Sequence, residues 1–442
     1  MSIRSYDSTF RPNFEFMGAG VWLGFGGVSS LAPVFFDVPM EPYLSFTALS
    51  VIMAARRLPQ GINLLKTKKR LRGMDLTFLG LEQLKPIAKK FADKEHLWLG
   101  YGWEWDNQHT QLVYELTKRS KSETLKFDRD PNKKGASWLH GLNQDEEEIS
   151  QPLSHTAGHV LIAGTTGSGK TRLFDHLITQ AILRKNEAVI IVDPKGDKEL
   201  CENARQACID AGDESRFVYF HPAFPEKSAR LDPLRNFNRA TELASRIAVL
   251  MASEQGNPFQ AFGQMALNNV VQGLLTAGER PNLVKVRSYL EGGTDALVAR
   301  AIAGYCDRID PQWESKAAPY IAKANTNEKK AHALIRFYRE QVKKKSPDLE
   351  GLFSMFEHDR EHFQKMIASL LPIMNMLTSG DLGPLLSPDP NDLDDERVIT
   401  DSARIIRTNQ VLYIGLDSLS DSMVGSAIGS IVLSDLTAVS GY

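Results

Sequence analysis

The chain has 442 residues, which is enough for two or three domains with separate hydrophobic cores. Its 42% hydrophobic and 24% charged residues are ordinary for a globular protein, and the formal net charge of −2 says little because the basic residues are clustered locally. The three cysteines are odd in number and lack metal-ligand spacing, which argues against a cysteine metal site and indicates a reducing compartment.

The N-terminal region predicts a transmembrane helical hairpin. Residues 16–36 carry no charge, and their number is close to the ~20 residues that cross a bilayer. A second uncharged stretch covers residues 42–55. Basic residues lie on both outer sides, at Arg4 and Arg11 and throughout 56–72, which places both ends in the cytoplasm. A buried helical hairpin of a soluble domain is the alternative.

Residues 76–128 predict a small α+β region. The aromatic run over residues 96–105 alternates as a strand does, and we expect its rings to lie in the sheet core. Stacking of these rings on nucleic-acid bases is the alternative. A polar, charged connector over residues 118–150 marks a boundary before the next domain.

The next segment has the form of a phosphate-binding loop between a strand and a helix. Residues 159–163 are a short apolar run typical of a buried parallel strand, and residues 172–183 have apolar side chains at helical spacing. The residues between them fit G-x-x-x-x-G-K-[ST]. With Arg172 added, the predicted nucleotide-binding residues are Gly164, Thr165, Thr166, Gly167, Ser168, Gly169, Lys170, Thr171 and Arg172.

These residue types suit a nucleoside triphosphate. The glycines let the backbone curl so that successive N–H groups point at the phosphates, and the N-terminus of the following helix adds partial positive charge. Lys170 can reach the β- and γ-phosphates, and the Thr171 hydroxyl can ligate Mg²⁺. The sequence therefore predicts ATP and Mg²⁺ as cofactors.

The rest of the chain predicts an α/β fold with a doubly wound parallel sheet. Strands are expected at residues 187–193 and 216–222. Residues 238–375 have helical periodicity almost throughout, and a strand returns at 410–417 before a helix at 423–439. The sheet is therefore expected to be interrupted by an all-α insertion and then resumed.

Triphosphate hydrolysis also needs a carboxylate at a strand end to hold Mg²⁺. Asp193 and Asp417 are available, but neither is followed by Glu. We predict Asp193 as the second metal ligand beside Thr171, with a turn-forming residue as the alternative. The basic stretch 316–345 is most simply a solvated helix face, and a contact with a phosphate backbone is the alternative.

Several motifs together resemble those of one family. They are Leu97-Trp98-Leu99-Gly100-Tyr101-Gly102, Gln108-His109-Thr110-Gln111, Trp138-Leu139-His140-Gly141-Leu142, the hhhD-P-x-G-[DE] pattern at residues 190–197 and the Ser-x-x-x-[ND]-Pro-Leu pattern at 228–234. With the phosphate loop, they make the chain resemble the type IV coupling proteins of conjugation, of the TraD type found in integrative conjugative elements. These proteins belong among the FtsK/HerA-like P-loop ATPases.

The resemblance implies a RecA-like P-loop sheet with an all-α insertion, preceded by the transmembrane hairpin and the small α+β region. It implies a homo-hexamer in the bacterial inner membrane, with the bulk of each chain in the cytoplasm. Such a protein links a relaxase–DNA complex to a type IV secretion channel and drives single-stranded DNA transfer. The predicted domains are 1–72 (hairpin), 73–150 (α+β region and linker), 151–237 (nucleotide-binding), 238–390 (all-α insertion) and 391–442 (returning part of the nucleotide-binding domain).

In that family a Walker B Asp-Glu pair lies in the C-terminal part, and this sequence ends before one. We therefore expect a truncated chain and leave open whether it hydrolyses ATP. Two other functions also stay open. One is a non-catalytic, membrane-tethered nucleotide-binding fragment, and the other is a cytoplasmic P-loop kinase-like enzyme that uses Asp193 for its metal.

Overall fold

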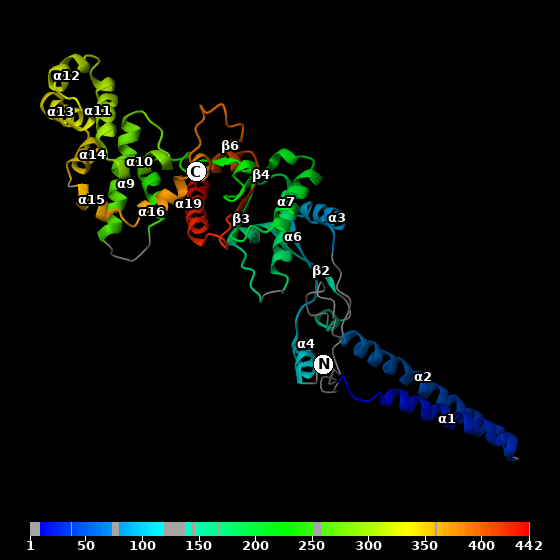
Figure 1. The fold of residues 1–442 in the computed structure, drawn as a ribbon. Coiled ribbons are helices and arrows are strands. Elements are labelled where there is room, and N and C mark those ends of the chain that lie inside the picture. Colours follow the sequence, from blue (N-terminus) through cyan, green and yellow to red (C-terminus); the bar gives the residue numbers. More distant parts are fainter. Residues whose placement is uncertain are drawn as a thin grey trace. The chain divides into compact units, whose positions relative to one another are not determined.

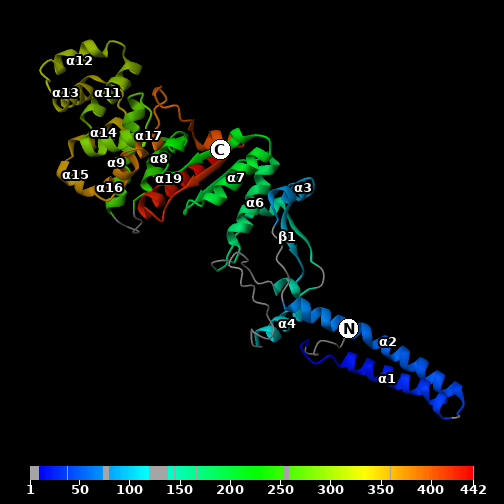
Figure 2. The ribbon, with the colours of Figure 1, turned by 45° about the vertical axis from the view of Figure 1, so that its right-hand side comes forward.

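The structure is a computed structural model, and it forms two compact units, Met1–Leu177 and Ile178–Tyr442. Figures 1 and 2 show the ribbon from two directions. The structure describes residues 9–36, 38–72, 79–118, 138–143, 146–165, 168–251, 258–358 and 360–441.

The first unit begins with two long helices, α1 (Phe14–Phe35) and α2 (Met40–Leu71), which lie side by side in both views (Figures 1 and 2). Gly26 of α1 permits close packing against α2, since a Cβ at this position would lie 2.9 Å from the Ser50 Cβ. The predicted helical hairpin is present, but α2 is longer than the apolar stretch 42–55. It is longer because the basic residues that follow are good helix formers and continue the helix.

The outer surface of α1 is apolar and exposed. Its exposed large apolar residues are Phe14, Met17, Val21, Leu23, Phe25, Val28, Leu31, Val34 and Phe35. Among the described residues, two helices are long and apolar enough to cross a membrane, α1 and α19 (Ser422–Ser440). The most apolar window of α19 is 44% buried, that of α1 only 17%. Because a core helix also passes such a test, α19 is no evidence for a membrane, and the α1 result is weak support for one.

The rest of the first unit contains a two-stranded antiparallel sheet. Strand β1 (His96–Gly102) confirms the predicted strand and pairs with β2 (Glu147–Pro152). Trp98 is buried, as expected for a core residue, whereas Tyr101 is 52% exposed. Strand β2 lies at the end of the predicted connector and crosses the predicted domain boundary at residue 150. The other elements are α3 (Leu81–Ala92), α4 (Asn107–Lys118), η1 (Leu139–Gly141) and η2 (Leu153–Gly158).

The second unit is built on a three-stranded parallel sheet. Its strands are β3 (Val189–Asp193), β4 (Phe217–Phe220) and β7 (Val411–Gly415), in the spatial order β3-β7-β4. All three were predicted. The last strand in sequence lies between the two earlier ones and is buried along its whole length. The chain therefore leaves the sheet after β4 and returns to its centre at β7. This agrees with the expected sheet that an insertion interrupts.

Helices cover both faces of this sheet. On one face, Val411 and Tyr413 of β7 pack with apolar residues of α6 (Lys170–Arg184) and α7 (Lys198–Asp210). On the other face, Leu412 and Ile414 share a core with α19 and with the helices of the insertion. Alternate residues of β7 thus point into different cores, as expected for a doubly wound sheet. The predicted domain boundaries remain a prediction.

Most of the described residues between β4 and β7 are helical, and the two-residue strands β5 (Arg230–Leu231) and β6 (Ile399–Thr400) in this segment pair in parallel. Residues 360–376 form two helices, and Pro372 lies in the first turn of the second one. The helices are α8 (Ala240–Ala248), α9 (Pro258–Thr276), α10 (Leu283–Gly292), α11 (Asp295–Ile309), α12 (Trp313–Ile321), α13 (Asn327–Gln341), α14 (Pro347–Glu357), α15 (Arg360–Met366), α16 (Leu371–Thr378), α17 (Leu382–Leu386) and α18 (Ser402–Arg407). Two short 3₁₀ helices lie on either side of β4, η3 (Glu214–Arg216) before it and η4 (Pro225–Lys227) after it.

Three of the nine basic residues in the stretch 316–345 form ion pairs with nearby carboxylates. Lys316 pairs with Asp310, Arg336 with Glu340, and Arg339 with Glu357, each at 2.6–2.8 Å. These charges are satisfied within the helical insertion. The pairs favour the solvated helix face over a contact with a phosphate backbone.

Candidate nucleotide-binding site

The loop between η2 and α6 curls around the side chain of Lys170. Its Nζ donates hydrogen bonds of 2.7 Å to the carbonyl oxygens of Gly164 and Thr165. The Ser168 N–H donates to the Thr165 carbonyl at 3.2 Å, and Gly169 has φ +92°, a conformation that favours glycine. The described residues before and after the middle of the loop thus meet at one ammonium group. Thr166 and Gly167 lie outside the described residues.

The first residue of this loop packs tightly against the residues that follow it, which favours glycine there. A Cβ at Gly164 would lie 2.4 Å from Ser168 Oγ and 3.4 Å from Lys170 Cγ. Helix α6 begins at Lys170, so the exposed side chains of Thr171 and Arg172 lie in its first turn. The lysine, the hydroxyl and a helix N-terminus therefore meet at one place, which is the set of groups that binds phosphate and Mg²⁺ in such loops.

The predicted strand at residues 159–163 is not formed, and this is a correction to the sequence analysis. His159 has φ +68°, and Leu161 is 92% exposed. None of the described strands pairs with this segment. A parallel strand depends on a neighbour that satisfies its backbone N–H and C=O groups, and a local apolar pattern cannot supply that neighbour.

The first half of α6 is held by β1 of the same unit. His176 Nε2 donates to the Trp98 carbonyl at 2.9 Å, and the two rings meet edge to face with centroids 5.0 Å apart. Burial lowers the pKa of His176, and its hydrogen bond to Trp98 opposes this effect. A neutral imidazole is therefore expected here at neutral pH, and it fixes the helix that follows the loop.

Asp193 lies in the second unit, at the end of β3, where it organises a turn. Its Oδ1 accepts from the Lys195 N–H at 3.0 Å, and its Oδ2 accepts from the Asp197 N–H at 2.5 Å and from the Tyr413 hydroxyl at 2.8 Å. The side chain is buried. This geometry fits the turn-forming alternative of the sequence analysis, and metal ligation by Asp193 stays a prediction. Asp417 also lies in a turn, where its Oδ1 accepts from Ser420 Oγ.

The carboxyl ends of the strands surround His221, which the sequence analysis did not identify. A Cβ at Gly415 would lie 2.4 Å from His221 Cδ2, so the imidazole packs directly on the end of β7. Its Nδ1 accepts from the Ala223 N–H at 3.2 Å. Burial lowers the pKa of His221, while Asp417 and Asp193 raise it. The sequence signal for this contact was a glycine at the end of a buried strand.

Metal binding at the loop would depend on few protein ligands. Among the described residues, no group of three or more His, Cys, Asp or Glu side chains could hold a metal ion. This does not affect the Mg²⁺ prediction, because a P-loop supplies one hydroxyl and the nucleotide supplies phosphate oxygens. Thr171 fits that role by its position in the first turn of α6.

Comparisons with known proteins agree with a nucleotide-binding domain. No curated protein matched the chain. A family model described as an AAA-like domain matches residues 148–311, a segment that includes the loop around Lys170, β3 and β4. The chain therefore carries an AAA-like domain over these residues, which supports a nucleotide-hydrolysing function in general.

Proposed function

We propose that this chain is a membrane-anchored ATPase that couples DNA to a type IV secretion channel and drives the transfer of single-stranded DNA. The observation that carries the nucleotide part is the loop around Lys170, which lies within the AAA-like domain. ATP would bind with its phosphates at Lys170 and the N-terminus of α6, and Mg²⁺ would lie at Thr171. Bound Mg²⁺ would neutralise charge that develops on the phosphates.

The membrane part of the proposal rests on α1 and α2. Helix α1 exposes nine large apolar side chains, and the second half of α2 is basic, as is common on the cytoplasmic side of a span. Insertion in a bacterial inner membrane would bury this surface. A homo-hexamer there would receive a relaxase–DNA complex and pass the DNA strand to the channel.

The test of the nucleotide part is ATP turnover by the full chain in detergent, with and without single-stranded DNA. We expect turnover that the DNA stimulates and that Lys170→Ala abolishes. Lys170→Ala should also weaken ATP binding at least about tenfold, or about 1.4 kcal/mol. Lys198→Ala, at an exposed position outside the loop, is the matched control. ATP binding without turnover or any response to DNA would refute the proposal and favour a non-catalytic nucleotide-binding fragment.

The test of the membrane part uses the exposed face of α1. The double variant Val21→Lys/Val28→Lys changes residues that are 56% and 70% exposed. We expect it to appear in the soluble fraction when membranes are extracted with alkaline carbonate. On translocon scales each lysine at the centre of a span costs about 2.5–3.5 kcal/mol. Val398→Lys, at a residue 58% exposed in the second unit, should leave the chain in the membrane. Recovery of the unmodified chain in the soluble fraction would refute the anchor and favour a cytoplasmic kinase-like enzyme.

A further inference from the structure

The second half of α2 carries positive charge that no carboxylate of the same helix segment balances. Residues 42–72 contain seven Lys and Arg side chains and no Asp or Glu. Two of the seven hold neighbouring segments in place. Lys68 Nζ donates to the Arg11 carbonyl, and Arg70 Nε donates to the Gly141 carbonyl at 2.7 Å. These two side chains are committed to the fold.

One side of α2 combines two other lysines with two exposed apolar side chains. Ile62, Leu65, Lys66 and Lys69 stand at positions i, i+3, i+4 and i+7, so they share one side of the helix. Ile62 and Leu65 are 43% and 49% exposed, and both lysines are exposed as well. Neither lysine side chain forms a hydrogen bond or an ion pair with a residue that the structure describes. These four residues are called the lysine face below.

Contacts with the start of α1 show where the lysine face lies relative to the apolar span. Asn13, the residue before α1, donates through Nδ2 to the Gly61 carbonyl at 2.9 Å. A Cβ at Gly61 would also lie 3.0 Å from the Phe16 ring. The apolar helix α1 therefore begins level with residue 61 of α2. At 1.5 Å per residue, Ile62 to Lys69 lie about 2–12 Å beyond that level along α2.

This position matches the headgroup layer of a bilayer that α1 spans. The hydrocarbon core is about 30 Å thick within a total of about 40–45 Å, which leaves about 5–8 Å of headgroups on each side. Ile62 and Leu65 would lie in this layer, and the flexible side chains of Lys66 and Lys69 extend back toward it. Exposed apolar side chains beside unpaired ammonium groups are typical of helix surfaces that bind anionic membranes.

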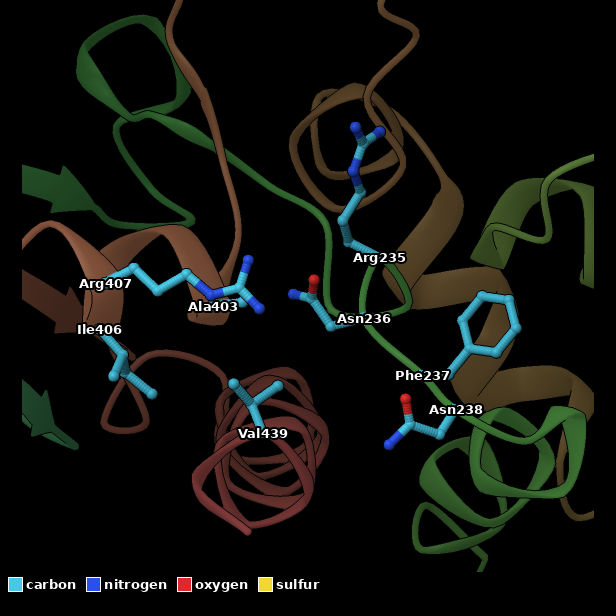
Figure 3. A pocket seen from close by; sticks show the side chains of 8 residues that line it. All are labelled: Arg235, Asn236, Phe237, Asn238, Ala403, Ile406, Arg407 and Val439. Atoms are coloured by element: carbon cyan, nitrogen blue, oxygen red, sulfur yellow. The ribbon is translucent and has the colours of Figure 1, made fainter. Parts of the chain in front are cut away.

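A pocket of about 300 Å³ in the second unit shows that basic side chains in one place do not by themselves form an anion site. Arg235 and Arg407 both line this pocket, but the Arg235 side chain is turned away from Arg407 (Figure 3). On α2, in contrast, the helical repeat places both lysines on the same side of one element.

We propose that the lysine face binds anionic phospholipids, with the lipid phosphates at Lys66 and Lys69 and the glycerol and upper acyl region against Ile62 and Leu65. This inference rests on the membrane anchor of the proposed function and goes beyond it, since an anchor needs only an apolar span. The occupant is a lipid rather than a nucleic acid, because the face offers aliphatic side chains and no aromatic ring on which a base could stack.

The test uses the full chain in detergent micelles that contain equal amounts of phosphatidylglycerol and phosphatidylcholine. Native mass spectrometry gives the ratio of the two lipids that stay bound to the chain. The variant Lys66→Gln/Lys69→Gln removes both charges, and Gln is a good helix former that keeps α2 intact. Its matched control is Lys343→Gln/Lys344→Gln, which changes two exposed lysines of the second unit. A third variant, Lys66→Arg/Lys69→Arg, keeps the charges.

We expect phosphatidylglycerol to predominate on the unmodified chain, on the control and on the arginine variant. A basic residue near an anionic membrane surface contributes about fivefold to binding, so loss of both lysines should lower the ratio of phosphatidylglycerol to phosphatidylcholine about 25-fold. A fall of less than about fivefold overturns the proposal. An equal fall in the control or in the arginine variant also overturns it, because the effect would then not depend on charge at the lysine face.

Two further measurements separate this inference from its alternatives. If Lys66→Gln/Lys69→Gln weakens binding of a fluorescein-labelled oligothymidylate and leaves the lipid ratio unchanged, the face contacts DNA and the lipid proposal is overturned. All variants should stay in the membrane during carbonate extraction, because α1 is unchanged. A chain that retains both lipids without preference contradicts the lysine face alone, whereas an unmodified chain in the soluble fraction refutes the anchor and the lysine face with it.

Discussion

The hydrogen bonds of Asp193 lead to a quantitative prediction about its role. The carboxylate accepts from two backbone N–H groups and from the buried Tyr413 hydroxyl. Asp193→Ala removes all three acceptor contacts. At about 1–1.5 kcal/mol for each hydrogen bond, we expect the second unit to lose roughly 3–4 kcal/mol of stability. Tyr413→Phe removes only the hydroxyl and leaves the two N–H contacts, so its cost should be about 1–2 kcal/mol.

The measurement is urea unfolding of the full chain followed by circular dichroism, together with ATP binding at several Mg²⁺ concentrations. If Asp193 forms the turn, Asp193→Ala lowers the urea midpoint most, Tyr413→Phe lowers it less, and the exposed control Glu226→Ala leaves it unchanged. Tyr413→Phe should keep the Mg²⁺ dependence of ATP binding. The reasoning is refuted if Asp193→Ala keeps the midpoint and loses the Mg²⁺ dependence, since Asp193 would then be a metal ligand.

Two further predictions concern the second unit. Gly415→Ala places a Cβ 2.4 Å from His221 Cδ2, so it should lower stability by about 1–3 kcal/mol in urea unfolding, and an unchanged midpoint would show that the imidazole moves freely. The pKa of Asp232 is raised by burial to about 6 from its ordinary 3.8, so the folded chain binds this proton more tightly than the unfolded chain does. The stability that this group contributes is therefore lost as pH rises through about 6, and Asp232 alone should contribute a gain of about 0.8 kcal/mol between pH 7.5 and 5.5. Asp435, whose pKa burial also raises to about 6, adds a gain of its own in this range. Asp232→Asn should remove the Asp232 gain, and an equal pH response of the two chains would contradict the assignment.

Local sequence patterns predicted the elements whose partners follow from hydrophobicity. The strands β3, β4 and β7 are apolar runs next to turn residues, and α6 has helical periodicity, so each was found near its observed bounds. The return of β7 to the sheet was also expected, because a strand follows the helical insertion. Its central position was not, since pairing order is not a local property of the sequence.

The predictions that failed or stayed open share one physical cause, which is that they depend on contacts between segments far apart in the sequence. Residues 159–163 have the composition of a buried strand, but composition does not show whether a neighbouring strand is in place. Strand β2 is polar, so its composition predicted a connector. It forms a strand because it pairs with β1, and this pairing is not visible in its own sequence. The turn role of Asp193 depends on the Tyr413 hydroxyl, which is far away in sequence. The lysine loop was predictable because all of its contacts are local.

The position of β7 at the centre of the sheet also has a consequence for biosynthesis. Strands β3 and β4 cannot pair with each other, since each bonds only to opposite edges of β7. They must therefore wait with unpaired edges while the ribosome makes the helical insertion. At about 5–20 residues per second, the roughly 190 residues between β4 and β7 take about 10–40 s to synthesise. Until Gly415 has left the exit tunnel, we expect the nascent chain to bind chaperones that shield unpaired strand edges.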